Sequence, residues 1–222
     1  MDGPGSKDRS QHPQVFAVLS GAIQGGAAAA LMRRTILDSR LPKCSYAQSF
    51  YLLKAAAQAG VYQELFPYLV VPWRKMMSQN LTTWAEDDVM FRSDCHGWSA
   101  VPINEIVSRI FGLSPASAGY GSLKIEPAFS LLPQHSKGSF VTKNGKVSFS
   151  WDSSVGLQIL SAFDIQVEIM GQRGPEIVHL KKGIPTIVCK TAHWPDRGQK
   201  EGDPGRPETS SHQAVEMMTV NG

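Results

Sequence analysis

The chain has 222 residues, 42% hydrophobic and 18% charged, enough to form one large or two modest globular domains. The net charge is only +3 and the basic residues are scattered, which argues against a nucleic-acid-binding protein. Residues 1–9 lack an apolar core, so no signal peptide is predicted and localisation stays unassigned. The apolar run 15–32 is interrupted by glycines, which favours packed helix over a membrane span.

The cysteine pattern argues against metal and disulfide frameworks. Cys44, Cys95 and Cys189 are few and widely spaced, and their odd number leaves at least one thiol free. We therefore expect no metal site and no cofactor.

The first half of the chain has a helical pattern. We expect residues 1–12 to be disordered and residues 13–113 to be helical, with Gly60 ending one helix and Pro67 and Pro72 kinking or dividing another. The predicted helical segments are 14–23, 27–38, 45–60, 61–79 and 102–111. Successive helices of this length with short connections predict antiparallel helical hairpins.

The second half changes to the two-residue period of strands. Residues 114–190 contain Asn144-Gly145 between two alternating segments, a strong hairpin signal. Further strands are expected in residues 157–169 and 177–188, with a turn at 171–175, which together predict an antiparallel β-sandwich. Residues 191–222 are rich in Pro, Gly, Ser and charge and are expected to be a disordered tail. The predicted fold class is therefore α+β with several domains.

Between these halves lies a stretch that concentrates chemistry. Residues 81–86 read Leu-Thr-Thr-Trp-Ala-Glu, and residues 92–100 read Arg-Ser-Asp-Cys-His-Gly-Trp-Ser-Ala. Indole rings beside polar groups suit a sugar, whose C–H faces stack on Trp and whose hydroxyls need donors and acceptors. Glu86 is placed to remove a proton from water, and His96 to hold a hydroxyl.

These motifs resemble the C-terminal part of bacterial-type α-L-rhamnosidases of glycoside hydrolase family 78, over about residues 14–188. The Arg-Ser-Asp-Cys-His-Gly-Trp-Ser-Ala stretch is the most specific piece. Residues 59–62 and 73–76 also resemble the family's last helical hairpin, and residues 121–127 resemble the entry to its sandwich. The resemblance implies helical hairpins from a partial (α/α)6 six-hairpin barrel, followed by a β-sandwich. It also implies inverting hydrolysis of terminal α-L-rhamnose, in which one carboxyl group protonates the leaving oxygen and another activates water.

The resemblance assigns roles to individual residues. Glu86, which follows the Thr-Thr stretch as the family's base does, becomes the general base, and His96 becomes the imidazole that hydrogen-bonds rhamnose. Trp84 and Trp98 become substrate-stacking or packing groups. Two charged residues of the loop are assigned from their residue types and not from the resemblance. Asp94 is expected to brace the loop by accepting hydrogen bonds, and Arg92 either supports it by pairing with Asp87, Asp88 or Asp94 or is a solvated charge.

One catalytic part of the family pattern is not found. The family's general acid lies in an upstream segment of closely spaced Asp, Arg, Glu and Trp, and no such segment precedes Glu86 here. There is also room for only part of the barrel. We therefore expect a truncated form of an enzyme for a rhamnose-containing glycoside, feeble or inactive when alone. It is either a fragment or misassembled product of an α-L-rhamnosidase gene, or a chain that works with another chain supplying the missing half. The alternative is a non-catalytic carbohydrate-binding remnant; neither reading involves a nucleic acid or a membrane.

Two further assignments stay open at this point. Asp87 and Asp88 directly follow Glu86 and compete with it for the role of base. Cys95 and His96 form a weaker candidate nucleophile pair, because neighbouring residues rarely aim both side chains at one point. Cys95 is instead expected to be a small buried residue.

Overall fold

The computed structural model describes residue 5 and residues 9–86, 93–171 and 174–190. The chain divides into two compact units between Pro102 and Ile103. The N-terminal unit is helical and the C-terminal unit contains two mostly antiparallel four-stranded sheets, so the α+β class is confirmed. The tail predicted at 191–222 lies outside the described residues.

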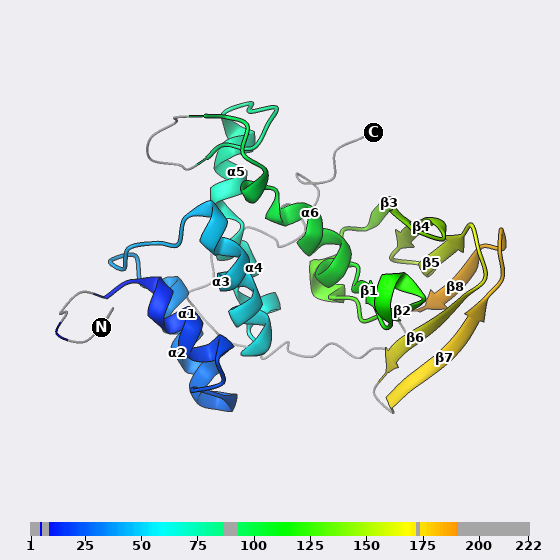
Figure 1. Cartoon of the computed structure of the whole chain (residues 1–222), viewed down its shortest axis with the longest axis horizontal. Coiled ribbons are helices and arrows are strands. Elements are labelled where there is room, and N and C mark those ends of the chain that lie inside the picture. Colours follow the sequence, from blue (N-terminus) through cyan, green and yellow to red (C-terminus); the bar gives the residue numbers. More distant parts are fainter. Residues whose placement is uncertain (1–4, 6–8, 87–92, 172–173, 191–222) are drawn as a thin grey trace. The chain divides into compact units, whose positions relative to one another are not determined.

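The described part of the N-terminal unit contains five helices, with α1 beside α2, α3 beside α4, and α5 following α4 (Figure 1). They are α1 (Gln11–Leu19), α2 (Gly25–Leu37), α3 (Tyr46–Gln58), α4 (Tyr62–Leu69) and α5 (Val71–Ser78). Helix α1 begins two residues before the helical zone expected from the sequence. No helix within the described ranges is both long and apolar enough to cross a membrane.

Local sequence signals set the helix ends. The Ser45 hydroxyl accepts a hydrogen bond from the Gln48 N–H at 3.3 Å and caps the start of α3. Gly60 follows the end of α3 with a φ of +72°, a conformation that glycine adopts without steric cost. The predicted long helix at 61–79 is divided at Val70, and Pro72 lies in the first turn of α5, where its missing N–H is harmless. The division expected from the prolines is confirmed at Pro72, whereas Pro67 lies inside α4.

Apolar side chains from all five helices form the core of this unit. Among those with at most 2% of their surface exposed are Val18, Met32, Leu53, Leu65, Phe66 and Trp73. On the surface, Arg33 of α2 and Glu64 of α4 form a forked ion pair with an Nη2–Oε2 distance of 2.7 Å. This pair connects two helices that are separated by α3 in the sequence.

Removing that ion pair tests how much it contributes. We expect Glu64→Gln to lower the free energy of unfolding by about 0.5 kcal/mol, because both side chains are half exposed and water screens them. Urea unfolding at low and at high salt measures the effect. The loss should shrink at high salt, and a loss that does not depend on salt would contradict an ionic origin.

The helical segment that enters the C-terminal unit differs from the expected single helix at 102–111. Helix α6 (Val101–Glu105) continues into a π-helical turn, η2 (Ile106–Ile110), in which the Phe111 N–H donates to the Ile106 carbonyl at 2.9 Å. Gly112 then ends the segment with a φ of +67°, as the sequence predicted. The sequence did not predict this turn, because hydrogen bonds between residues five apart do not change the spacing of apolar positions over so few residues.

The first sheet has the order β1-β2-β6-β7 and the second β3-β4-β5-β8. Their bounds are β1 (Leu113–Pro115), β2 (Ser122–Ile125), β3 (His135–Thr142), β4 (Gly145–Asp152), β5 (Gly156–Ser161), β6 (Ile165–Gly171), β7 (Gly174–Leu180) and β8 (Thr186–Cys189). Short 3-10 turns, η3 (Ala118–Tyr120) and η4 (Phe129–Leu131), lie between the early strands. Every described strand pair is antiparallel except β2 with β6.

The predicted hairpin is confirmed, and one expectation about the strands is wrong. Strands β3 and β4 pair from Thr142–Gly145 to His135–Asp152, with the turn at Asn144. The parallel pairing of β2 with β6 contradicts a purely antiparallel module. It arises because residues 157–169 form two strands that belong to different sheets. Each sheet buries alternate side chains, among them Leu123, Ile125, Val147, Phe149, Val167 and Ile169.

Candidate functional site

The two motif segments are joined to each other through their main chains. The His96 N–H donates to the Trp84 carbonyl at 2.8 Å, and the Glu86 N–H donates to the Ser93 carbonyl at 2.9 Å. The Thr83 hydroxyl adds a bond to the Asp94 carbonyl. Residues 83–86 and 93–96 therefore run beside each other in opposite directions, as in a hairpin. This pairing brings positions 86 and 96 together although ten residues separate them in the sequence.

Glu86 and His96 meet in this frame. The Glu86 Oε2 lies 3.9 Å from the His96 Nε2, beyond hydrogen-bond length but within ion-pair range when the imidazole is protonated. The Glu86 side chain is 8% exposed and that of His96 is 24% exposed. A carboxylate and an imidazole so placed can act on one ligand, the first as a proton acceptor and the second as a hydrogen-bond partner.

Trp98 stands beside this pair. Its ring centroid is 4.5 Å from that of His96 at an interplanar angle of 49°, and its indole N–H points to the Glu86 carbonyl at 3.4 Å. Trp98 is nevertheless 51% exposed, so much of its ring surface remains open to a ligand. Trp84 is half-buried, and its carbonyl accepts the bond from His96.

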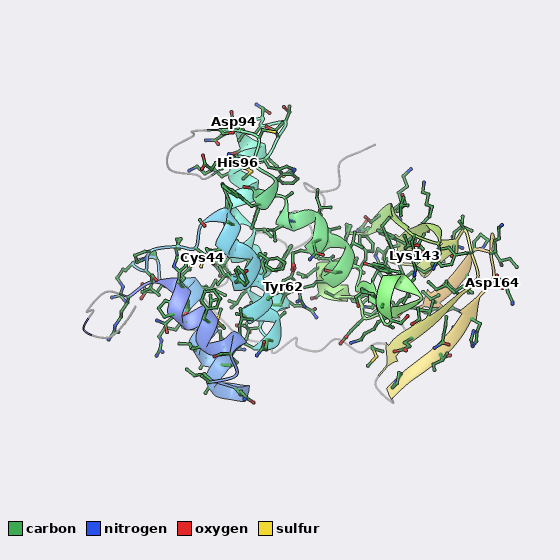
Figure 2. The ribbon with its side chains drawn as sticks, in the orientation of Figure 1. Cys44, Tyr62, Asp94, His96, Lys143 and Asp164 are labelled. Carbon is green, nitrogen blue, oxygen red and sulfur yellow. The ribbon has the colours of Figure 1, made fainter. Side chains whose placement is uncertain are left out.

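The loop is attached to helix α5 through Ser99. The Trp73 indole N–H donates to the Ser99 carbonyl at 2.7 Å, and the Ser99 hydroxyl donates to the Ala85 carbonyl. Ser99 belongs to the 3-10 turn η1 (Gly97–Ser99) that follows His96. Figure 2 shows His96 and Asp94 in this loop, close to α5. Sequence reasoning assigned no role to Ser99, because a serine inside a loop motif gives no signal of its own burial.

The remaining predicted residues of the loop have different outcomes. Asp94 has an exposed side chain, and its carbonyl is the group that accepts the Thr83 bond. Cys95 is exposed, so the expectation that it is buried is wrong. Arg92, predicted to support the loop, and Asp87 and Asp88, the competing bases, lie outside the described residues.

The described residues offer neither a metal cluster nor a buried thiol that ionises readily. Within residues 9–86, 93–171 and 174–190, no three His, Cys, Asp or Glu side chains gather as metal ligands would. Burial raises the pKa of the Cys44 thiol and of the Cys189 thiol to about 11, which keeps both protonated at neutral pH.

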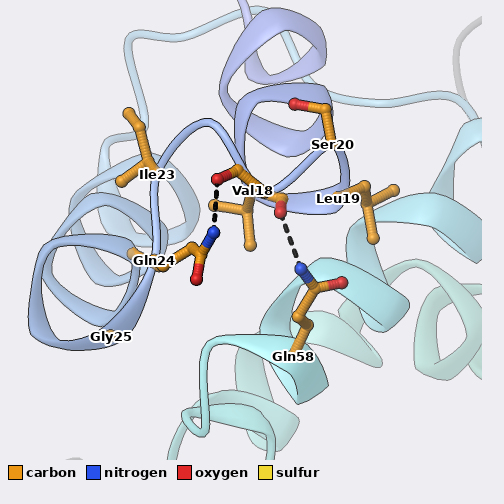
Figure 3. A pocket seen from close by; sticks show the side chains of 9 residues that line it. Val18, Leu19, Ser20, Ile23, Gln24, Gly25 and Gln58 are labelled. Atoms are coloured by element: carbon orange, nitrogen blue, oxygen red, sulfur yellow. Dashed lines mark hydrogen bonds between the residues drawn. The ribbon is translucent and has the colours of Figure 1, made fainter.

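A pocket of about 360 Å³ lies elsewhere in the N-terminal unit (Figure 3). It is lined by the end of α1, the start of α2 and Gln58 of α3, whose amide donates to the Val18 carbonyl at 2.7 Å. Gln24 donates to the Gly21 carbonyl at the same distance. None of the predicted site residues lines this pocket.

Two other carboxylates of this unit are poorly suited to act as acids. Hydrogen bonds from Arg40 lower the pKa of Asp38 to about 2, and the bond from Arg33 lowers the pKa of Glu64. Both groups are therefore ionised at neutral pH and have no proton to give to a leaving group.

No protein-family profile and no curated protein sequence matches the chain. Solved structures do. The chain is similar to the GH78 family rhamnosidase of Bacillus sp. GL1, with a TM-score of 0.63 and 24% identity over 74% of this chain and 19% of that one. An α-L-rhamnosidase from Aspergillus terreus matches with a TM-score of 0.59 and 18% identity, covering 82% of this chain and 24% of the other.

A third match is the α-L-rhamnosidase of Streptomyces avermitilis, solved in complex with L-rhamnose. Its TM-score is 0.54 and its identity 16%, over 78% of this chain and 21% of that one. The chain therefore spans about a fifth to a quarter of the length of the rhamnosidases that it resembles. At these identities the likeness establishes the fold, and the resemblance predicted from the sequence is confirmed: this chain has the fold of part of an α-L-rhamnosidase.

Proposed function

We propose that this chain carries the base-bearing, sugar-contacting side of an α-L-rhamnosidase-like cleft. The observation on which the proposal rests is the approach of the Glu86 carboxylate to within 3.9 Å of the His96 imidazole, beside the half-exposed Trp98 ring. A terminal α-L-rhamnose unit offers this group of side chains an apolar face, hydroxyl groups and an anomeric carbon.

The proposed reaction divides the work between two carboxyl groups. Glu86 takes a proton from a water molecule, whose oxygen attacks the anomeric carbon while the bond to the glycosidic oxygen breaks. A general acid gives its proton to that departing oxygen, so the configuration at the anomeric carbon is inverted. His96 holds a rhamnose hydroxyl, and the ring of Trp98 contacts the apolar side of the sugar. Trp84 supports the loop through its main chain.

The acid is proposed to come from outside this part of the chain. Asp38 and Glu64 are held ionised by their arginine partners, and the chain spans only about a fifth to a quarter of its structural relatives. A second polypeptide or a longer form of the protein would supply both the acid and the remaining helical hairpins. We accordingly propose that the helices of the N-terminal unit are part of an (α/α)6 barrel. The two sheets, each with one buried set of alternate side chains, are proposed to be a β-sandwich.

A second candidate function is carbohydrate binding without catalysis. It is favoured by the open Trp98 ring next to His96, which can hold a sugar even where no acid is present. Hydrolysis of an aryl α-L-rhamnoside separates the two functions. A binding remnant stays inactive when joined to an acid-bearing rhamnosidase segment, whereas the base-bearing side of an enzyme gains activity.

Titration with L-rhamnose tests the sugar site directly. We expect L-rhamnose to move the NMR resonances of the His96 imidazole and the Trp98 indole, and His96→Ala to raise the dissociation constant about tenfold, because one hydrogen bond is lost. D-rhamnose, the mirror image, should move neither resonance. His135→Ala is the matched control, since it removes an exposed imidazole from β3. An unchanged dissociation constant in His96→Ala would contradict the assignment.

A further inference from the structure

Ser99 has three polar groups, and all three are engaged. Its N–H donates to the His96 carbonyl at 3.2 Å, its hydroxyl donates to the Ala85 carbonyl, and its carbonyl accepts from the Trp73 indole at 2.7 Å. The side chain is completely buried at 0% exposure. Hydrogen bonds in such a position are not weakened by competition from water.

The three partners of Ser99 belong to different parts of the site. The first is His96 itself, and the second, Ala85, directly precedes Glu86 in the chain. The third, Trp73, belongs to helix α5. One serine thus connects the segment of the proposed base, the segment of the sugar-binding imidazole and a helix of the core.

Trp73, the partner of Ser99 on helix α5, is held in place by its packing. Trp73 is 2% exposed, and its ring lies against that of Tyr46 of α3 with centroids 5.7 Å apart. The Tyr46 hydroxyl donates to the Pro72 carbonyl at 3.2 Å, beside Trp73 in the chain. The position of the Ser99 carbonyl is therefore set by two packed helices and not by the loop.

Other contacts of the loop are less protected. The bond from the Trp98 indole to the Glu86 carbonyl is long at 3.4 Å, and Trp98 is half exposed. Thr83, which donates to the Asp94 carbonyl, is exposed as well. Among the side chains described in this loop, Ser99 combines complete burial with contacts to both functional segments.

We propose that Ser99 is the positioning residue that sets the separation between Glu86 and His96. Being buried, it does not touch the substrate; it acts through the main chain on each side of the site. This proposal rests on the proposed function for the roles of Glu86 and His96, but the geometry that it concerns is measurable without a sugar.

Amide hydrogen exchange and NMR of the whole chain test the proposal. In Ser99→Ala we expect the amides of Glu86 and His96 to exchange at least about tenfold faster, and the indole N–H resonance of Trp98 to shift. Trp73→Phe, which keeps the aromatic ring but removes the N–H donor, should have the same effect in weaker form. Amides of α1 and α2 should exchange at the wild-type rate in both variants, because the change is local.

Two further variants complete the experiment. Ser99→Thr keeps the hydroxyl and should restore slow exchange and the Trp98 resonance. Ser78→Ala removes a hydroxyl that donates to the Lys75 carbonyl at the exposed end of α5, and it should change neither amide. Exchange rates of Glu86 and His96 that stay at the wild-type level in Ser99→Ala and Trp73→Phe would overturn the positioning role.

Adding L-rhamnose separates this proposal from the proposed function. We expect Ser99→Ala to raise the dissociation constant for L-rhamnose about fivefold and Ser99→Thr to recover it, whereas loss of overall stability alone would leave the affinity of the folded protein unchanged. A wild-type chain that gives no response to L-rhamnose would refute the sugar site while leaving the exchange result valid. A normal response with unchanged exchange in the variants would refute the positioning role alone.

Discussion

Glu86→Gln is expected to lower kcat for an aryl α-L-rhamnoside by about 10²–10⁴-fold, because an amide cannot accept the proton of the attacking water. The measurement needs the general acid, so residues 1–190 of this chain would replace the matching segment of the Bacillus sp. GL1 rhamnosidase. L-rhamnose binding should be largely kept, since His96 and Trp98 are unchanged. The loss should therefore appear in kcat more than in KM.

Glu64→Gln in the same chimera is the matched control. It makes the same chemical change in the same unit, but at a carboxylate paired with Arg33, and kcat should stay at the level of the unsubstituted chimera. A nearly normal kcat in the chimera that carries Glu86→Gln would show that Glu86 is not the base. Substituting Asp87 and Asp88 by Asn, one at a time, would then identify which of the neighbouring carboxylates activates water.

Gly112→Ala is expected to destabilise the C-terminal unit by more than about 4 kcal/mol. Gly112 has a φ of +67°, and a Cβ at this position would lie 2.1 Å from the Glu126 carbonyl group. The backbone has no room to yield, because the Glu126 N–H donates to the Gly112 carbonyl and the Ala128 N–H to that of Ile110. Thermal unfolding, followed by the near-ultraviolet signal of Trp151, measures the loss.

Gly183→Ala isolates the steric part of that effect. Gly183 has a similar φ of +73° in the same unit, but a Cβ there would meet no atom within 4 Å. Gly183→Ala should lower the free energy of unfolding by only about 1–2 kcal/mol, the cost of holding a residue with a Cβ at a positive φ. Equal losses in the two variants would mean that the close approach of Glu126 does not matter.

Signals that depend on a few neighbouring residues predicted much of the fold. Pro67 and Pro72 indicated the division of a long helix, and Asn144-Gly145 indicated the hairpin of β3 and β4, because each constrains the backbone locally. The parallel pairing of β2 with β6 was not predictable in this way, since it depends on which sheet each strand joins. The π-helical turn at 106–110 was also not predicted. It changes the hydrogen-bond spacing over too few residues to alter the pattern of apolar positions.

The site shows the same division. Glu86, His96 and Trp98 were found because their residue types suit a sugar and their motif resembles that of a known family. The structure brings these three together, whereas their catalytic and binding roles remain predictions. Ser99 was overlooked because its importance lies in burial and in main-chain bonds, which residue type does not reveal. Cys95 was placed inside because cysteines are usually buried, but in the structure it is exposed, as is the adjacent Asp94.

The pairing of β2 with β6 also constrains the order in which the C-terminal unit can fold. Strands β3, β4 and β5 are connected by short turns, so they can zip together from local contacts within microseconds. The pairing of β2 with β6, by contrast, joins residues 44 positions apart in the chain, such as Ser122 and Gln166. Closing so long a loop costs entropy before its contacts form, so the β2–β6 pairing should form later than the local β1–β2 and β6–β7 pairings of the same sheet.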